Sequence, residues 1–205
     1  MGVTIHYSFT LKDAALLKLL VEEVVDICKS MEWKFNVINE PSINSFTAFA
    51  QNKLRYKESD IAGLLFSPNP NCEPVWLTFL PNGRTSTIAN VSFDEYTSEH
   101  EMLYWAFTKT QFAGADVHVA IVKLFKYLGS KYFETIEVED EGGYWNTGDL
   151  NQLQKNIGFI NVAISTLQEA IQQLPVIEGE SINDLADRIE ALLKNKLNNT
   201  DNDGQ

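Results

Sequence analysis

The chain has 205 residues, of which 44% are hydrophobic and 21% charged, as is typical of a globular protein with one well-packed domain or two small ones. Asp and Glu number 28 against 16 Lys and Arg, which gives a formal net charge of −12. Phosphate backbones and anionic membrane surfaces would repel such a chain, so neither nucleic acid nor a membrane is an expected partner. A basic protein partner or a bound cation would relieve the repulsion.

The N-terminal residues, MGVTIHYSFTLKD, alternate apolar and polar side chains. They lack the basic region and the continuous apolar region of a secretion signal. No stretch approaches the roughly 20 apolar residues that a membrane-spanning helix requires. We therefore expect a cytoplasmic protein, in which Cys28 and Cys72 are free thiols.

The first elements follow from hydrophobic periodicity. Alternation over residues 3–9 predicts a half-buried strand, and helical spacing over residues 11–31 predicts an amphipathic helix. Thr10 and Asp13 have the spacing of a capping box at the start of that helix. Alternation returns over residues 33–37, which predicts a second strand.

Residues 40–61 interrupt the pattern and predict a long irregular excursion, of a kind that is often functional. An apolar run over residues 62–68 predicts the next strand. The pair Asn82–Gly83 supplies the positive φ angles of a tight turn. Residues 75–80 and 85–92 are therefore predicted to pair as an antiparallel hairpin.

Helices dominate the second half. Ser98 and Glu101 indicate a short helix that includes Trp105 and Ala106, and a longer helix follows Gly114 and ends at Gly129. The β-branched alternation of FETIEVED predicts a strand, and two further helical patterns begin near Leu150 and after Ser181, the first ending at Pro175.

This order, β-α-β-β-β-β-α-α-β-α-α, is typical of an α+β fold. We expect an antiparallel or mixed sheet of about five to six strands with helices packed on one face. Residues 1–175 are predicted to form a single domain, residues 176–197 a C-terminal helix packed on it, and residues 198–205 a disordered tail.

The stretch EVEDEGGYWNTGD, residues 137–149, gathers carboxylates, glycines and aromatic rings. It does not fit a calcium-binding EF-hand loop, because the twelfth position is Gly148 instead of glutamate and a strand precedes it. Strand alternation instead sends the glutamates outward and Ile136 and Val138 inward. We favour a strand end and a turn, in which Tyr144 and Trp145 fold back as a lid; a partner-binding loop that presents these two rings is the alternative.

His118 is the histidine best placed for chemistry, at the edge of the apolar face of its helix. If that helix packs beside the strand 133–140, His118 meets Asp140 or Glu141. Together with Asp149 these side chains would form a site for one divalent metal ion. The other interpretation is a histidine at the margin of the core, hydrogen-bonded to the backbone.

The chain has no G-x-S-x-G, H-E-x-x-H, P-loop or dinucleotide-binding motif. Three hypotheses remain. The first is an intracellular acidic binding protein without catalytic activity or cofactor, such as an adaptor, inhibitor or immunity-like protein. The second is a metal-dependent hydrolase that uses His118, Asp140, Glu141 and Asp149. The third is a binder of a small apolar ligand in an aromatic pocket under the 40–61 segment.

Overall fold

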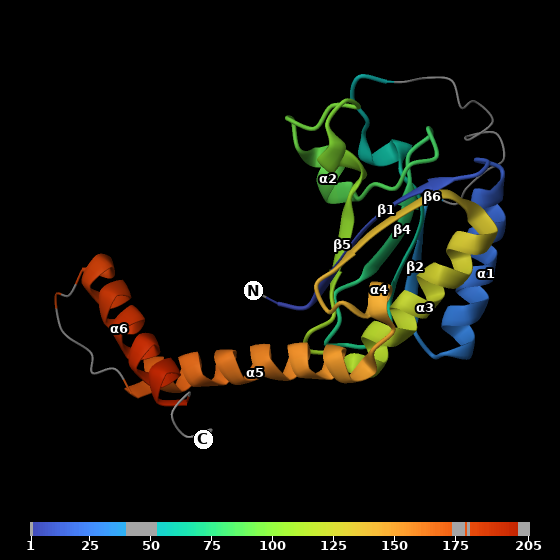
Figure 1. The fold of residues 1–205 in the computed structure, drawn as a ribbon. Helices are drawn as coiled ribbons and strands as arrows, with labels where there is room; N and C mark the ends of the chain where they lie inside the picture. Colours follow the sequence, from blue (N-terminus) through green and yellow to red (C-terminus); the bar gives the residue numbers. More distant parts are fainter. Residues whose placement is uncertain (1, 40–52, 174–178, 180, 201–205) are drawn as a thin grey trace. The chain divides into compact units, whose positions relative to one another are not determined.

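Six strands and two long helices form most of the first part of the chain (Figure 1). The computed structural model describes residues 2–39, 53–173, 179 and 181–200. The strands are β1 (Thr4–Leu11), β2 (Lys34–Ile38), β3 (Ala62–Ser67), β4 (Val75–Phe79), β5 (Ala106–Lys109) and β6 (Phe133–Asp140). The helices are α1 (Leu16–Ser30), α2 (Ile88–Ser92), α3 (Ala115–Tyr132), α4 (Tyr144–Thr147), α5 (Leu150–Gln173) and α6 (Ile182–Thr200), with 3-10 turns at Glu58–Asp60 and Glu101–Tyr104.

The strands divide into two three-stranded sheets, in the orders β5-β1-β6 and β2-β3-β4. Every strand pair is antiparallel. The α+β class and the number of strands are therefore confirmed, and the strands form two small sheets where the sequence suggested one.

The two sheets meet along β4, through different groups at its two ends. At one end, Thr85 bridges Phe79 of β4 and donates its N–H to Phe9 O of β1 at 2.9 Å. At the other end, the N–H of Glu73 donates to Lys109 O of β5 at 3.1 Å. Between them the Tyr7 hydroxyl accepts from Trp76 N at 2.8 Å and donates to Trp76 O at 3.2 Å. This side chain therefore satisfies backbone groups of β4 that a neighbouring strand would otherwise pair.

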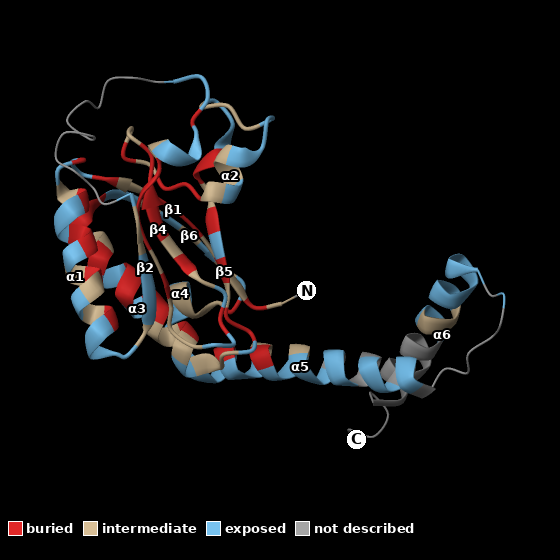
Figure 2. Cartoon of the chain, turned by 180° about the vertical axis from the view of Figure 1, so that it is seen from behind, coloured by how far each residue is buried: buried red, intermediate tan, exposed pale blue. Residues whose placement is uncertain are grey.

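Helices α1 and α3 lie side by side and cover one face of the strands (Figure 1). Buried residues are concentrated on the strands and on the facing sides of these two helices, whereas most of the described side chains of α5 and α6 are exposed (Figure 2). The central aromatic cluster is made by Tyr7, Phe9 and Phe125, with ring centroids 4.7–5.1 Å apart. The opposite face of the sheets therefore stays free to carry polar side chains. None of the described helices has the length and hydrophobicity needed to cross a bilayer.

Two predicted elements differ from the structure, and tertiary contacts explain both. The hairpin expected between residues 75–80 and 85–92 begins, since Thr85 bridges Phe79 in antiparallel register and Ser86 N donates to Thr78 O at 3.0 Å. It stops there because α2 begins at Ile88, capped by Thr87, whose hydroxyl accepts from Asn90 N at 3.1 Å. Residues 98–106 were expected as a helix, but a 3-10 turn is followed by β5, which pairs with β1. In both places distant pairing outweighs local propensity.

Smaller corrections concern helix ends. Thr10 belongs to β1, and α1 is preceded by Asp13, whose carboxylate accepts from Ala15 N at 2.8 Å. Gly129 lies inside α3 and does not end it. A Cβ at Gly129 would lie 2.9 Å from Ile136 Cδ1, so this glycine permits the close approach of β6.

The chain consists of two compact units, residues 1–157 and 158–205, and α5 crosses the boundary between them. The predicted C-terminal helix is α6, and its Ser181–Asp184 capping box forms with an Asp184 N to Ser181 Oγ distance of 3.2 Å. Residues 198–200, expected in a disordered tail, extend this helix. Residues 201–205 of that tail, and residues 40–52 of the predicted excursion, lie outside the described residues.

Candidate functional site

The strand β6 presents carboxylates on both of its faces. Glu137 and Glu139 are exposed on the outer face, and Ile136 and Val138 pack against the core on the inner face. Both positions follow the predicted alternation. Residues two apart on a strand share a face, so Asp140, which follows Ile136 and Val138 at this spacing, also turns its side chain inward.

The inward turn brings Asp140 to His118 of α3, as the hypothesis of a helix beside this strand required. His118 Nε2 lies 3.1 Å from Asp140 Oδ1, and both side chains are 0% exposed. The contact is close but does not have the alignment of a hydrogen bond, and Nε2 has no hydrogen-bond partner among the described residues. The imidazole is thus a core histidine paired with a carboxylate, where the sequence suggested a marginal position.

Backbone donors complete the carboxylate's environment. Asp140 Oδ1 accepts from Gly142 N at 2.7 Å, and Oδ2 accepts from Trp145 N at 2.7 Å. Burial by itself would raise the pKa of Asp140, but the close contact and charge of His118, together with these two N–H groups, lower that pKa below its usual value. The ionised carboxylate therefore fastens the turn after β6 to α3.

Gly142 is required in this turn by close packing. A Cβ there would lie 2.6 Å from Leu153 Cδ1, and 3.0 Å from both Asp140 Oδ1 and His118 Cε1. Any side chain would therefore push on both members of the buried pair and on α5. The carbonyl of Gly142 also accepts from Asn156 Nδ2 at 3.1 Å, which ties the start of α5 to the same turn.

The second nitrogen of His118 contacts Thr110, a residue that the sequence gave no reason to single out. His118 Nδ1 lies 2.8 Å from Thr110 Oγ1, and this hydroxyl lies 3.2 Å from Val3 O. The Thr110 hydroxyl can donate its proton to His118 Nδ1 or to Val3 O. In the second case the N–H at Nδ1 donates to the Thr110 hydroxyl oxygen. Thr110 is also buried. The chain Asp140–His118–Thr110 is closed to solvent, so it serves as an internal clamp in this conformation.

The other two residues of the predicted metal site lie elsewhere. Glu141 Oε2 accepts from Thr4 N at 2.9 Å, and its Oε1 lies 3.7 Å from His6 Nε2 on the outer face. Asp149 caps α5 by accepting from Asn151 N at 2.8 Å and Gln152 N at 3.2 Å. Within the described part of the chain, no three His, Cys, Asp or Glu side chains are grouped as metal ligands. A metal at His118 and Asp140 would thus have two side-chain ligands from the predicted set.

Tyr144 and Trp145 form the short helix α4 and are partly buried against the core. Lys126 of α3 donates to Trp145 O at 2.8 Å, and its ammonium lies 5.1 Å from the centroid of the Trp145 rings. This arrangement is the predicted lid. The alternative, a loop that presents these rings to a partner, stays a prediction.

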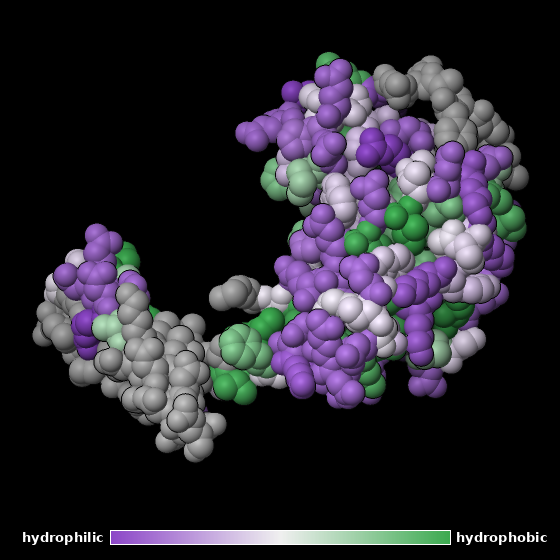
Figure 3. All heavy atoms as spheres, viewed as in Figure 1, coloured by the Kyte–Doolittle hydropathy of each residue, from purple (hydrophilic) through white to green (hydrophobic). Residues whose placement is uncertain are grey.

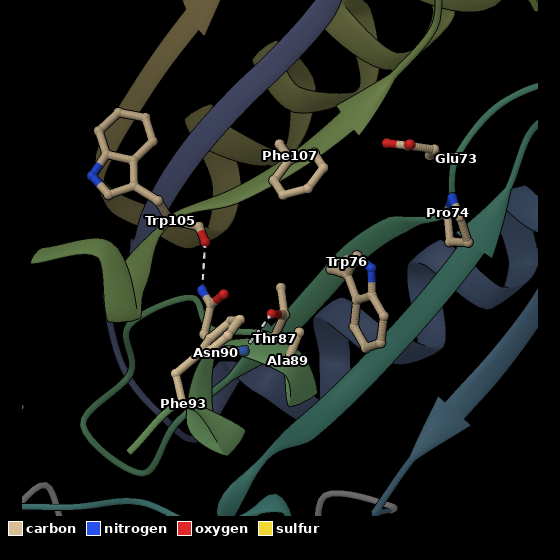
Figure 4. Close-up of a pocket in the computed structure, with 9 residues that line it drawn as sticks. All are labelled: Glu73, Pro74, Trp76, Thr87, Ala89, Asn90, Phe93, Trp105 and Phe107. Carbon is tan, nitrogen blue, oxygen red and sulfur yellow. Dashed lines mark hydrogen bonds between the residues drawn. The ribbon is translucent and has the colours of Figure 1, made fainter. Parts of the chain in front are cut away.

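A groove of about 410 Å³ opens where β4 and β5 diverge, between the two sheets. Figure 4 shows Trp76 of β4 and Phe107 of β5 on its opposite sides, with Phe93 at one end. The indole of Trp105 points away from the groove, while its carbonyl accepts from Asn90 Nδ2 at 2.7 Å (Figure 4). The groove is mainly apolar and lies beside α2, and none of its lining residues belongs to residues 53–61, the described part of the segment under which the sequence suggested a pocket.

The edge of β5 that lines this groove has a free backbone position. Thr110 N donates to Val3 O at 3.0 Å, so Thr108 and Ala106 also face β1, and Phe107 faces the groove. Lys109, two residues on, is paired on that side with Glu73, through Lys109 N to Glu73 Oε2 at 3.0 Å. Among the described residues, none pairs with the N–H and C=O of Phe107.

The groove continues into the acidic outer face of β6. Phe107, His6 and Glu139 lie opposite one another on β5, β1 and β6, and so form one row across the sheet. The rings of His6 and Phe107 have centroids 6.0 Å apart. Glu137 and Glu141 flank this row, and Lys109 shares the face, so its net charge is negative. Hydrophilic side chains cover most of the surface seen in Figure 3.

The residues of this surface that sequence reasoning missed are Phe107 and Phe93. Phe107 was missed because β5 was taken for a helix, and Phe93 because α2 was taken for a strand. The surplus of aromatic residues was the available signal, and it indicated a pocket without placing it.

Fold and site together define an α+β protein with two three-stranded antiparallel sheets, a buried histidine–carboxylate clamp and an acidic face beside an aromatic groove. No protein-family model, no curated protein and no solved structure matches the chain.

Proposed function

We propose that this protein acts in the cytoplasm by binding, without catalysis, and that its partner is a basic protein that lays an extended segment over the outer face of the β5-β1-β6 sheet. The observation that carries this proposal is the row formed by Phe107, His6 and Glu139, which joins an aromatic groove to a negative surface. Aromatic anchors and charge complementarity are what a protein interface of this kind uses.

The row sets the spacing of the partner's side chains. Neighbouring strands lie about 4.8 Å apart, so Phe107 and Glu139 are separated by about 10 Å. An extended chain advances about 3.3 Å per residue. An apolar side chain in the groove and a Lys or Arg over Glu139 should therefore lie about three residues apart in the bound segment.

The backbone of β5 supports an extended partner as well. The N–H and C=O of Phe107 face the groove, so a segment that enters the groove can form a main-chain hydrogen bond there before it crosses the sheet toward Glu139. The groove adds the pocket that gives specificity.

Selection from random displayed peptides against the purified chain tests the proposal. We expect enriched peptides to pair an aromatic or large aliphatic residue with Lys or Arg about three positions away. The double variant Glu137→Lys/Glu139→Lys should bind them at least about tenfold more weakly, and the wild-type association rate should fall as salt rises.

The matched control is Glu22→Lys/Asp26→Lys, which makes the same charge change on the exposed side of α1, the helix that covers the other face of the strands. It should bind like the wild type. Enrichment of peptides without basic residues, or equal loss of binding in both double variants, would show that the outer face is not the docking surface.

A further inference from the structure

Strand β6 is an edge strand, and its free side carries unpaired backbone groups. Glu141 N donates to β1 at 3.1 Å, so alternation along the antiparallel pair turns the backbone groups of Glu137 and Glu139 toward β1. Those of Ile136 and Val138 face the side of β6 on which the sheet ends. In the part of the chain that the structure describes, no hydrogen bond reaches the N–H or C=O of these two residues. The edge therefore offers the main-chain groups that a further strand would use.

The apolar layer on the inner face of the sheet is also incomplete at this edge. Val138 lies opposite Tyr7 of β1, and Ile136 lies opposite Phe9. Tyr7 and Phe9 are 0% exposed, whereas Ile136 and Val138 are only half-buried. A strand added beside β6 would place one side chain next to each of them. Apolar residues at those two positions would complete the layer.

The outer face of the same edge is acidic. Glu137 and Glu139 are exposed there and alternate with the inward-facing Ile136 and Val138. Directly opposite residues of neighbouring strands have Cβ atoms about 5 Å apart, so side chains of an added strand would reach both carboxylates. The two faces together specify a strand with Lys or Arg opposite Glu137 and Glu139 and apolar residues opposite Ile136 and Val138.

A second copy of this chain does not meet that requirement. β6 contains no Lys or Arg, so pairing two β6 edges brings no cation to either acidic face. In the register that pairs Ile136 with Val138, Glu137 would lie directly opposite the same residue of the other copy, and like charges in that position are destabilising. The glutamates therefore oppose self-pairing of the edge and favour a basic strand.

The rest of the chain does not supply this strand either. The residues that the structure does not describe contain no Lys or Arg. Helices α5 and α6 pair their backbone groups internally, so neither can add to a sheet edge. Lys53 and Arg55 have the required spacing, but they pair with Asp60 and Asp94. A strand with the required alternation must therefore come from another protein.

We propose that β6 binds an extended strand of a basic protein partner, in which Lys or Arg alternates with apolar residues. The strand pairs with the backbone of Ile136 and Val138, and its basic side chains lie over Glu137 and Glu139. Main-chain hydrogen bonds supply affinity, and the alternation supplies specificity. The site goes beyond the proposed function because it uses the backbone of β6 and does not require the groove at Phe107.

Amide hydrogen exchange of the isotope-labelled full chain, followed by NMR, tests the site. In the free chain the amides of Ile136 and Val138 should exchange at least about 100-fold faster than those of Glu137 and Glu139, which donate to β1. A synthetic peptide of alternating Val and Lys, added at about ten times its dissociation constant, should slow the two exposed amides about tenfold. A control peptide with Glu in place of Lys should leave them unchanged.

Charge variants test the pairing across the outer face. Glu137→Lys/Glu139→Lys should reverse the preference, so that the Glu peptide protects the amides of Ile136 and Val138 and the Lys peptide does not. The control Glu22→Lys/Asp26→Lys makes the same charge change on the exposed side of α1 and should keep the preference of the wild type. Equal protection by both peptides in the wild type would contradict the proposed complementarity.

The exchange measurement also distinguishes the other occupants of the edge. Slow exchange of the amides of Ile136 and Val138 in the free chain at every concentration would mean that the chain itself covers the edge. Protection that grows with the concentration of the chain alone would mean that a second copy pairs there. A Lys peptide that binds while both amides stay in fast exchange would lie elsewhere. Each of these results overturns the proposal, and the last one leaves the proposed function at the groove intact.

Discussion

Asp140 and Glu139 are adjacent carboxylates on one strand, and the structure uses them in opposite ways. Asp140 faces inward, fully buried, and accepts from two backbone N–H groups beside His118. Glu139 faces outward, exposed, in a row with His6 and Phe107. They differ because successive side chains of a strand point to opposite faces of the sheet.

The comparison shows that a cluster of carboxylates in a sequence need not be a site. The same stretch supplies an internal clamp from one face of β6 and an acidic surface from the other. The clamp costs desolvation, which the two backbone N–H groups and the imidazole beside the carboxylate offset, whereas the surface costs little and keeps its charge available.

The largest expected effect separates these two carboxylates. Asp140→Ala should lower the free energy of unfolding by about 3 kcal/mol, because it leaves the imidazole and two buried N–H groups without their partner. Glu139→Ala should change it by less than about 0.5 kcal/mol. Urea denaturation of both variants measures the difference, and equal effects would refute the distinction between the faces.

The loss of unfolding free energy in Asp140→Ala should be smaller at acid pH. The pKa of Asp140 is lowered by folding, so its contribution is present above the carboxyl's usual pKa and is lost as the pH falls through the lowered value. The gap in stability between wild type and Asp140→Ala should therefore shrink on acidification. A gap that stays constant down to low pH would indicate that Asp140 is not ionised in the folded state.

Gly142 gives the next largest effect and tests how tightly the inner face is packed. Gly142→Ala should destabilise the fold by about 1–3 kcal/mol, because its Cβ overlaps Leu153 and presses on the clamp. Gly158→Ala is the control, since nothing lies near its Cβ within α5 and alanine favours helix by about 0.5–1 kcal/mol. Thermal melting should show shifts of opposite sign.

Glu23 provides an intermediate case, a partly exposed carboxylate with several partners. It links α1 to α3 by accepting from Lys131 Nζ at 2.8 Å and from the hydroxyls of Tyr127 and Tyr132. Partial burial would raise the pKa of Glu23, but these hydrogen bonds, that of Lys131 above all, lower the pKa to about 2. Solvent exposure of Lys131 weakens the interaction, so Glu23→Gln should cost about 1 kcal/mol at neutral pH.

The pH dependence of that cost identifies its source. Because the pKa is lowered from 4.5 to about 2, the contribution of Glu23 is present above pH 4.5 and is lost as the pH falls toward 2. Urea titrations of wild type and Glu23→Gln at several pH values should therefore converge in acid. A cost that does not change with pH would mean that packing, and not charge, links the two helices here.

The sequence by itself determined the elements that have strong periodicity. Strands β1, β2, β3, β4 and β6 and helices α1, α3, α5 and α6 were predicted, because each buries one face and its apolar residues repeat at the matching period. The same rule set the two faces of β6, including the outward position of Glu137 and Glu139. The local hydrophobic pattern is sufficient to predict a strand or a helix when the element buries only one of its faces.

Only the tertiary structure decided where short segments pair and which polar groups meet. β5 is a strand because β1 offers an edge to it, and α2 is a helix because its Asn90 reaches the carbonyl of Trp105. His118 meets Asp140 and not Glu141 because α3 packs on the inner face of β6, toward which Asp140 points. The physical reason is common to these cases: contacts between residues far apart in sequence leave no periodic trace in either segment.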